Sequence, residues 1–325
     1  MQKKDIRIVY MGTPDFAVPT LDALVTGGYN VVGVITMPDK PAGRGHKMQF
    51  SPVKQYALDH NLPLLQPEKL KDEQFLADLR AWQADLQIVV AFRMLPEVVW
   101  NMPRMGTFNL HAALLPQYRG AAPLNWAVIN GDEKTGCTTF FLDHEIDTGC
   151  IILKEELPIA PEENVGSVHD RMMEMGKGLV CRTVDLLVEA EGNVASIPTI
   201  DQETLCQDVT ELRPAPKIFK ETCEMHYDRK VRELRNLVRG LSPYPAAWTT
   251  LTTSAGETMS PVKVFRTSIV KEGVPQAPEE IGKVLTDQKS YIHVVCADGV
   301  LALEELQLPG KKRMEVKALL NGFKL

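Results

Sequence analysis

The sequence predicts an α/β protein with an N-terminal domain built on a mostly parallel sheet and a smaller C-terminal domain that forms an antiparallel β-barrel. Two observations support this prediction. In the first half of the chain, short β-branched runs alternate with helical segments, which is typical of a parallel sheet. After about residue 190, short extended runs follow one another with turn signals between them, as in small antiparallel barrels.

The first half opens with residues 6–11, a β-rich run that ends at Gly12. Residues 17–25 then place apolar side chains at helical spacing, which predicts a helix. Residues 38–47 combine Pro, Gly and basic side chains and are expected to form a loop. Further strands are predicted at residues 31–36, 86–91, 107–111 and 138–142.

The second half begins with a predicted helix at residues 228–239, where apolar side chains share one face. The two prolines of residues 242–245 stop this helix. We place the domain boundary near residue 207, so that the domains span residues 1–207 and 208–325, and the first includes a linker from about residue 190. The extended runs of the barrel are predicted at residues 247–251, 262–266, 291–296 and 300–306.

The 325 residues carry 36 Lys and Arg against 42 Asp and Glu, a formal net charge of −6. With 44% hydrophobic and 24% charged residues, the composition is that of an ordinary globular protein and excludes collagen, coiled coil and intrinsic disorder. The charge is unevenly distributed, because residues 1–206 carry −9 and residues 207–325 carry +3. The acidic total excludes indiscriminate binding to nucleic acids, whereas the basic second part leaves room for a narrow contact.

The six cysteines lie at least 13 residues apart and include no Cys-x-x-Cys pair, so we expect free thiols and no metal site. No apolar run approaches the roughly 20 residues that a bilayer span needs. The protein is therefore expected to be soluble and cytoplasmic, with no membrane partner.

The first strand-to-helix turn does not fit a dinucleotide. It offers Gly12 where the nicotinamide fingerprint needs three glycines, and Pro14 removes an N–H that could bind phosphate. No Gly-Lys-Ser/Thr sequence occurs, which argues against a phosphate-loop nucleotide site. A nicotinamide oxidoreductase is thereby disfavoured.

The strongest constellation consists of Asn109, His111 and Asp147. Residues two apart on a strand point to the same face, so Asn109 and His111 project together while Leu110 faces the other way. The predicted strand at residues 138–142 leads into the loop that carries Asp147. Because ligands of open α/β sheets bind at the carboxyl ends of strands, we expect both segments to deliver their polar groups there.

An amide, an imidazole and a carboxylate, without a nucleophilic Ser or Cys, suit acyl transfer by direct attack of an amine. The Asn109 amide can donate to the oxyanion of a tetrahedral intermediate, a contribution of about 3 kcal/mol for one good donor. His111 can stabilise that oxyanion as imidazolium or relay protons, and a nearby Asp147 would raise the pKa of His111 and fix its orientation. Singly, each of these residues is more often structural, but together they favour catalysis.

Seven stretches of the sequence match one family in order. They are Gly12-Thr13-Pro14-Asp15-Phe16, residues 38–45, Ser51-Pro52-Val53-Lys54, Asn109-x-His111, residues 114–123 with Leu114-Leu115-Pro116 and Arg119-Gly120, Asp147-Thr148-Gly149, and residues 239–248 with Pro243, Pro245 and Trp248. On these stretches the chain resembles the folate-dependent formyltransferases over nearly its whole length.

The resemblance implies a Rossmann-like formyltransferase domain and an OB-like C-terminal barrel. It also implies transfer of a formyl group from 10-formyltetrahydrofolate to the free α-amine of methionyl initiator tRNA, with Asn109, His111 and Asp147 as the catalytic trio. The family usually carries Ser at the position of Ala113, so a hydrogen bond to folate or to a neighbouring backbone group is lost here. The segments that line the folate pocket in the family correspond to Phe92, Arg93, Met94, Leu95, Ala113, Leu114, Leu115 and Pro116.

The basic loop corresponds to the family segment that reaches the tRNA acceptor end, which implies contacts from Lys40, Arg44 and Lys47. Phosphate contacts of this kind displace counterions and therefore weaken with salt. The C-terminal domain is implied to bind tRNA as well, and residues 220–225 depart there from the family's more aromatic pattern. We expect a monomer whose partners are initiator methionyl-tRNA and tetrahydrofolate, with no DNA partner.

Two other interpretations stay open. A sugar-nucleotide amine formyltransferase would share the chemistry of the trio but would lack a basic C-terminal domain and the acceptor loop. A non-catalytic RNA-binding relative is disfavoured, since nothing in tRNA binding alone requires all three groups.

Overall fold

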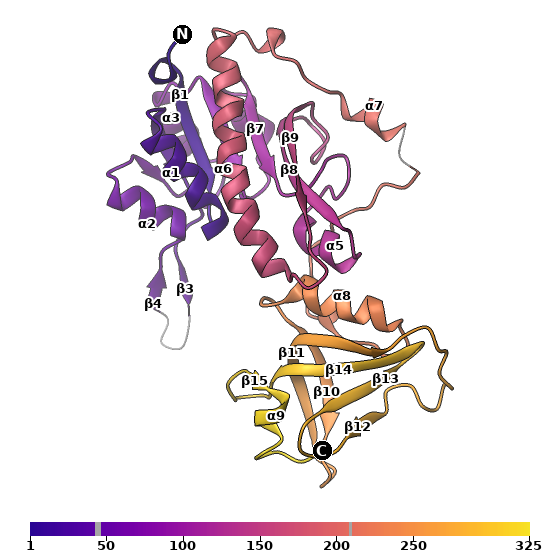
Figure 1. Cartoon of the computed structure of the whole chain (residues 1–325). Coiled ribbons are helices and arrows are strands. Elements are labelled where there is room, and N and C mark those ends of the chain that lie inside the picture. Colours follow the sequence, from indigo (N-terminus) through magenta and orange to yellow (C-terminus); the bar gives the residue numbers. More distant parts are fainter. Residues whose placement is uncertain (43–46, 208–209) are drawn as a thin grey trace. The chain divides into compact units, whose positions relative to one another are not determined.

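The computed structural model describes residues 1–42, 47–207 and 210–325, which form two compact units (Figure 1). Each unit is assembled from three stretches of the chain. Unit 1 consists of Met1–Gly120, Thr135–Leu157 and His169–Pro214, and unit 2 consists of Ala121–Lys134, Pro158–Val168 and Ala215–Leu325.

The sheet of unit 1 has seven strands in the order β5-β2-β1-β6-β7-β8-β9. The first five of these run parallel, and β8 is antiparallel to β7, so the prediction of a mostly parallel sheet is confirmed. The strands are β1 (Arg7–Gly12), β2 (Asn30–Ile35), β5 (Leu64–Leu65), β6 (Leu86–Val90), β7 (Thr107–His111), β8 (Lys134–Phe141) and β9 (Ile151–Pro158).

Both faces of this sheet are covered by helices. Val9, Met11 and Val89 belong to an apolar cluster that includes residues of α3 and α4. On the opposite face α6 approaches β7, and a Cβ added at Gly176 of α6 would lie 2.8 Å from Leu110 Cδ2. The helices that carry residues of unit 1 are α1 (Val18–Thr26), α2 (Pro52–Asp59), α3 (Glu73–Ala81), α4 (Glu97–Trp100), α6 (Val165–Glu189) and α7 (Gln202–Cys206).

Two local expectations for this unit need correction. Residues 38–47 were predicted to form a loop, but they contain β3 (Lys40–Ala42) and the first residue of β4 (Lys47–Gln49), and these two strands pair antiparallel. Strand β8 begins four residues before the predicted start at residue 138. Neither β9 nor the 25-residue helix α6 was among the predicted elements.

Unit 2 contains an antiparallel sheet in the order β10-β11-β14-β13-β12, with β15 paired to β14. This sheet forms a half-barrel, in agreement with the predicted antiparallel C-terminal domain. The predicted helix at residues 228–239 begins instead at Val231, whose N–H donates to Asp298 Oδ1 at 2.8 Å. The elements are α5 (Pro123–Ile129), α8 (Val231–Leu241), β10 (Ala247–Thr252), β11 (Thr258–Lys271), β12 (Val284–Thr286), β13 (Ile292–Cys296), β14 (Gly299–Gln307), β15 (Met314–Glu315) and α9 (Val316–Leu319).

Helices α5 and α8 pack closely at Gly240. A Cβ at this position would lie 2.4 Å from Ile129 Cγ1 and 2.8 Å from the Ile129 backbone nitrogen. The Gly240 carbonyl also accepts a hydrogen bond from Asn125 Nδ2 at 2.8 Å. The absence of a side chain at Gly240 therefore lets α5, from the first half of the chain, join the core of unit 2.

We expect Gly240→Ala to lower the free energy of unfolding by about 1–3 kcal/mol, because the added methyl group forces α5 and α8 apart. The matched control is Gly178→Ala in α6, where a Cβ would meet only Arg182 Nη1 at 3.9 Å. That change should stabilise the helix by up to about 1 kcal/mol. Urea denaturation followed by circular dichroism measures both, and equal stability of the two variants would contradict the packing argument.

Candidate active site

Strand β7 places Asn109 and His111 on one face of the sheet, as predicted from their spacing. Asn109 is half-buried and lies beside Val89 of β6, on the face covered by α3 and α4. His111 ends the strand and is 6% exposed. The carboxyl ends of β1, β6 and β7 lie together, because Gly12 pairs with Val90 and Val90 pairs with Leu110.

Asp147 reaches His111 by a different route from the one expected. Because β8 is antiparallel to β7, its last residue, Phe141, lies opposite Phe108 at the far end of β7. The carboxyl end of β8 therefore does not meet that of β7, and the expectation of a shared edge is wrong. Residues 142–150, named here the Asp147 loop, turn back so that Asp147 Oδ2 lies 3.9 Å from His111 Nδ1.

Two features of the backbone hold Asp147 at this place. Asp147 Oδ2 accepts a hydrogen bond from the backbone N–H of Gly120 at 2.9 Å. Near the end of the loop, a Cβ at Gly149 would lie only 1.8 Å from the carbonyl oxygen of Phe141. The glycine of Asp147-Thr148-Gly149 is thus required by the close return of the loop to the end of β8.

The protonation of His111 follows from its surroundings. Its Nε2 lies 2.8 Å from the carbonyl oxygen of Tyr118, which can only accept, so Nε2 carries a proton. Burial lowers the pKa of His111, and the Asp147 carboxylate and the Tyr118 carbonyl offset this only in part. The imidazole is therefore neutral at neutral pH, with its Nδ1 lone pair on the side of Asp147. The Asp147 carboxylate raises the pKa of His111, as predicted, but the lowering by burial is larger.

The first predicted folate segment follows β6 directly. Phe92 and Arg93 are half-buried, Met94 is 73% exposed and Leu95 is buried in the apolar cluster under α3. The Arg93 guanidinium donates to the carbonyl oxygens of Pro67 and, at 2.8 Å, of Glu68. These bonds anchor the segment, and its exposed apolar surface comes from Met94.

The second folate segment follows β7 and is fixed to β8. Thr138 Oγ1 donates to the Ala113 carbonyl at 2.7 Å and accepts from the Leu115 N–H at 3.2 Å. Ala113, Leu115 and Pro116 are buried, whereas Leu114 is half-buried. A ligand could therefore reach the Leu114 side chain and the backbone of this segment.

The structure places only part of the predicted tRNA-binding set. Lys40 is the first residue of β3 and Lys47 the first residue of β4, while Arg44 lies outside the described residues.

Across residues 1–42, 47–207 and 210–325, no group of three or more His, Cys, Asp and Glu is arranged to hold a metal ion. Within the same ranges, no helix has both the length and the apolar composition to cross a membrane.

Three contributors to the site were missed from the sequence. The carbonyl of Tyr118 and the N–H of Gly120 act through the backbone, so their side chains gave no signal. Gln202 bonds to the Asp147 loop from a helix 55 residues further along the chain. No spacing pattern links residues so far apart.

Comparison with known proteins shows matches across both parts of the chain. The family model described as formyl transferase matches residues 6–184, and the formyl transferase C-terminal domain model matches residues 217–324. The methionyl-tRNA formyltransferase of Bacteroides fragilis is 62% identical over 325 residues, which is 100% of this chain and 97% of the relative. The methionyl-tRNA formyltransferase of Flavobacterium johnsoniae is 51% identical over 98% of this chain and 96% of its own length.

Solved structures with the same fold are more distant in sequence. WlaRD, a sugar 3N-formyl transferase crystallised in the presence of dTDP and 5-N-formyl-THF, has a TM-score of 0.64 at 16% identity and covers 94% of this chain and 99% of its own. HypX from Aquifex aeolicus in complex with tetrahydrofolic acid has a TM-score of 0.59 at 17% identity, over 98% of this chain and 47% of its own. At these identities the likeness shows the fold alone.

We expect Asp147→Asn to lower the pKa of His111 further, because the carboxylate that favours the imidazolium is removed while the burial stays. Histidine signals followed by NMR from pH 8 to pH 4 measure this shift. The matched control is Asp143→Asn in the same loop, whose carboxylate accepts from the His144 N–H at 2.6 Å. A His111 titration that moves equally in both variants would refute the coupling.

Proposed function

The chain belongs to the formyl transferase family, and from this premise we propose that it transfers the formyl group of 10-formyltetrahydrofolate to the free α-amine of methionyl initiator tRNA. The observation that carries the proposal is the 62% identity, over the full chain, to a relative named methionyl-tRNA formyltransferase. The placement of His111 beside Asp147 supports it, because amine formylation needs an acceptor for the amine proton, and a carboxylate nearby stabilises the imidazolium that results.

The proposed reaction joins the amine nitrogen to the formyl carbon and then breaks the bond between that carbon and N10 of the folate. An α-amine titrates near pH 8 (about 7.7–8.0), so a useful neutral fraction exists without a strong base. Asn109 donates to the oxyanion formed by the attack. Neutral His111 receives the amine proton at Nδ1, and the proton then passes to the leaving N10.

The carboxylate of Asp147 contributes at the moment when His111 becomes charged. An imidazolium in this buried position is costly, and the carboxylate oxygen 3.9 Å from Nδ1 offsets that cost. The imidazolium can then stabilise the oxyanion together with Asn109. The two roles considered for His111, proton relay and oxyanion stabilisation, thus follow one another in a single reaction.

For folate, the proposal assigns the segments that follow β6 and β7. Met94 and Leu114 offer accessible apolar surface for a pterin ring, and Arg93 orients the first segment through its bonds to the Pro67 and Glu68 carbonyls. Buried Ala113, Leu115 and Pro116 shape the pocket from behind. Both segments lie beyond carboxyl ends of parallel strands, where open α/β sheets bind ligands.

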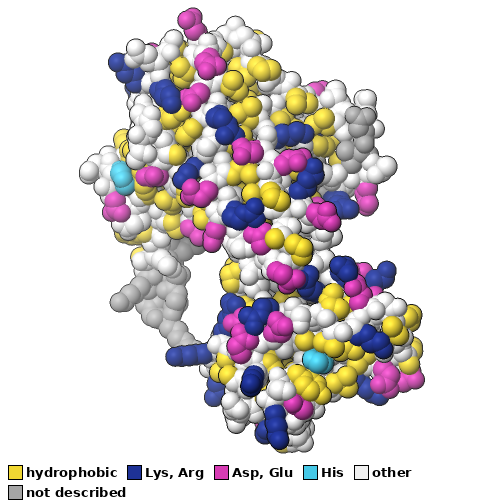
Figure 2. All heavy atoms as spheres, viewed as in Figure 1, with side chains coloured by type: hydrophobic (Ala, Val, Ile, Leu, Met, Phe, Trp, Pro, Cys, Tyr) yellow, Lys and Arg dark blue, Asp and Glu magenta, His cyan; other side chains and the backbone are white. Residues whose placement is uncertain are grey.

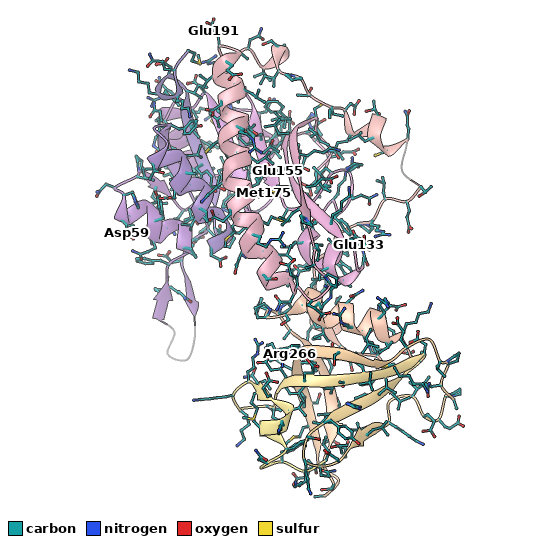
Figure 3. The ribbon with its side chains drawn as sticks, in the orientation of Figure 1. Asp59, Glu133, Glu155, Met175, Glu191 and Arg266 are labelled. Atoms are coloured by element: carbon teal, nitrogen blue, oxygen red, sulfur yellow. The ribbon has the colours of Figure 1, made fainter. Side chains whose placement is uncertain are left out.

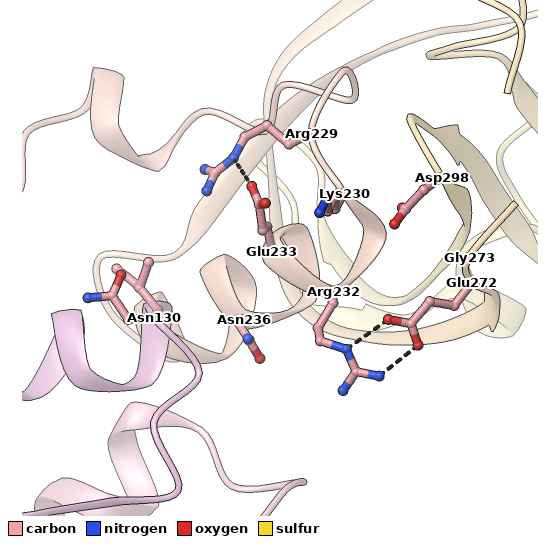
Figure 4. A pocket seen from close by; sticks show the side chains of 10 residues that line it. Asn130, Arg229, Lys230, Arg232, Glu233, Asn236, Glu272, Gly273 and Asp298 are labelled. Carbon is pink, nitrogen blue, oxygen red and sulfur yellow. Dashed lines mark hydrogen bonds and ion pairs between the residues drawn. The ribbon is translucent and has the colours of Figure 1, made fainter. Parts of the chain in front are cut away.

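For tRNA, the proposal assigns Lys40, Arg44 and Lys47 and the domain at residues 208–325. Figure 2 shows basic and acidic side chains interspersed over the visible surface. Several arginines near α8 are held in ion pairs, such as Arg229 with Glu233 at 3.1 Å and Arg232 with Glu272 at 2.7 Å, beside a cavity of about 660 Å³ (Figure 4). The exposed Lys311 and Lys312 are therefore stronger candidates for phosphate contacts than these arginines.

We further propose that the protein works as a cytoplasmic monomer. The alternative acceptor, an amino-sugar nucleotide, does not account for the full-length identity to methionyl-tRNA formyltransferases. Incubation of the protein with 10-formyltetrahydrofolate and methionyl initiator tRNA should yield N-formylmethionine after deacylation. No product with tRNA, alongside turnover of an amino-sugar nucleotide, would overturn the proposal.

We expect His111→Ala and Asp147→Asn each to lower kcat by about 100-fold or more with little change in tRNA affinity, because they remove the proton acceptor or its partner. Single-turnover kinetics and filter binding separate the two quantities. His60→Ala, at the exposed end of α2, serves as the control. A variant that binds tRNA weakly but turns over normally would contradict the assigned roles.

We expect Arg44→Ala to raise the KM for tRNA and to reduce the slope of log affinity against log salt by about 1, since one phosphate contact is lost. Its kcat should stay close to that of the unmodified protein. Arg80→Ala, an exposed arginine of α3, is the matched control and should leave the slope unchanged. Titrations between 50 and 200 mM salt test this, and an unchanged slope for Arg44→Ala would count against the contact.

A further inference from the structure

Gln202 begins α7 and is fully buried, although it lies in the predicted linker rather than in the sheet. Its Nε2 donates to two carbonyl oxygens of the Asp147 loop, that of Asp147 at 3.0 Å and that of Gly149 at 2.7 Å. Its Oε1 accepts two hydrogen bonds from Arg119, from Nε at 3.1 Å and from Nη2 at 2.7 Å. Both donors and both acceptor positions of the amide are therefore used.

A fully satisfied, buried amide fixes the groups around it. The bond to the Gly149 carbonyl is buried and the other three are partly buried, so moving the loop would break hydrogen bonds that water replaces only in part. The two carbonyls that Gln202 holds flank Thr148, on the segment that carries the carboxylate nearest to His111. Gln202 thus acts on the backbone at Asp147 and not on its carboxylate.

The backbone at Asp147 needs such a support. Asp147 has φ of +57°, a left-handed conformation that non-glycine residues adopt at a cost. A strained residue persists only where its surroundings determine it from several sides. The backbone N–H of Gly120 donates to the Asp147 carboxylate at 2.9 Å. The side chain of Gln202 donates to the Asp147 carbonyl, and Arg119, the neighbour of Gly120 in the chain, holds Gln202 in place.

We propose that Gln202 is a positioning residue for the formyl transfer, which holds the Asp147 loop so that Asp147 faces His111, and that Arg119 fixes Gln202 in that role. The catalytic part of this inference rests on the proposed function. The contacts that support it all lie within unit 1. It makes the linker segment a part of the active site.

The same part of the chain provides a matched control. Gln117 binds the segment that follows the linker through its side chain, donating to the Glu211 carbonyl at 3.0 Å and accepting from the Arg213 N–H at 2.8 Å. These side-chain bonds reach that segment and not the Asp147 loop. Replacing Gln117 therefore weakens the attachment of that segment without removing a support of Asp147.

The test compares Gln202→Glu with Gln117→Glu in the full chain. Glu at position 202 keeps the size and the acceptor for Arg119 but loses both donors to the loop. We expect Gln202→Glu to lower kcat about 10- to 100-fold, with the KM for tRNA and for 10-formyltetrahydrofolate unchanged within about twofold. We also expect the pKa of His111 to fall, because Asp147 moves away from it.

Gln117→Glu should change neither kcat nor the His111 titration. If both glutamine variants behave alike, or if Gln202→Glu lowers only the melting temperature, the proposal is overturned. If Gln202→Glu does not fold, Arg119→Ala replaces it and should give the same loss of kcat. The His111 titration needs no substrate, so an unmodified protein that fails to formylate tRNA refutes the proposed function alone, and an unmoved titration refutes this inference alone.

Discussion

The buried approach of Asp147 to His111 is the contact on which the rest of the site depends. Strand β8 runs away from the end of β7, so the contact exists only because the Asp147 loop turns back along it. The return requires a glycine at position 149, where a side chain would meet the Phe141 carbonyl. The arrangement is thus a property of backbone geometry as much as of the His111 and Asp147 side chains.

Two opposing electrostatic effects meet at His111. Burial favours the neutral imidazole, while the carboxylate beside it favours the charged form, and burial prevails in the resting protein. The neutral imidazole can accept a proton, and the carboxylate beside it stabilises the charged form that results. Unpaired, the same histidine in the same interior would resist protonation throughout.

Short-range features of the site were predictable from the sequence, whereas long-range ones were not. Alternation along Thr107–His111 gave both the bounds of β7 and the shared face of Asn109 and His111. The direction of β8 is not encoded in its residue pattern, so the route of Asp147 was predicted wrongly. Counting charges likewise could not predict which of them form ion pairs. Arg266, labelled in Figure 3, pairs with Glu304 at 2.8 Å and with Glu315 at 2.7 Å, so part of the basic excess is neutralised by ion pairs within the domain.

The two family models match separate stretches of the chain, yet the folded units are interlaced. Helix α5, encoded between β7 and β8, completes the core of unit 2 through its packing on Gly240. A polypeptide that began at residue 208 would leave the apolar contact surface of α8 uncovered and would tend to aggregate. The C-terminal part is therefore not an interchangeable module: a chimaera of two relatives should take α5 and α8 from the same parent.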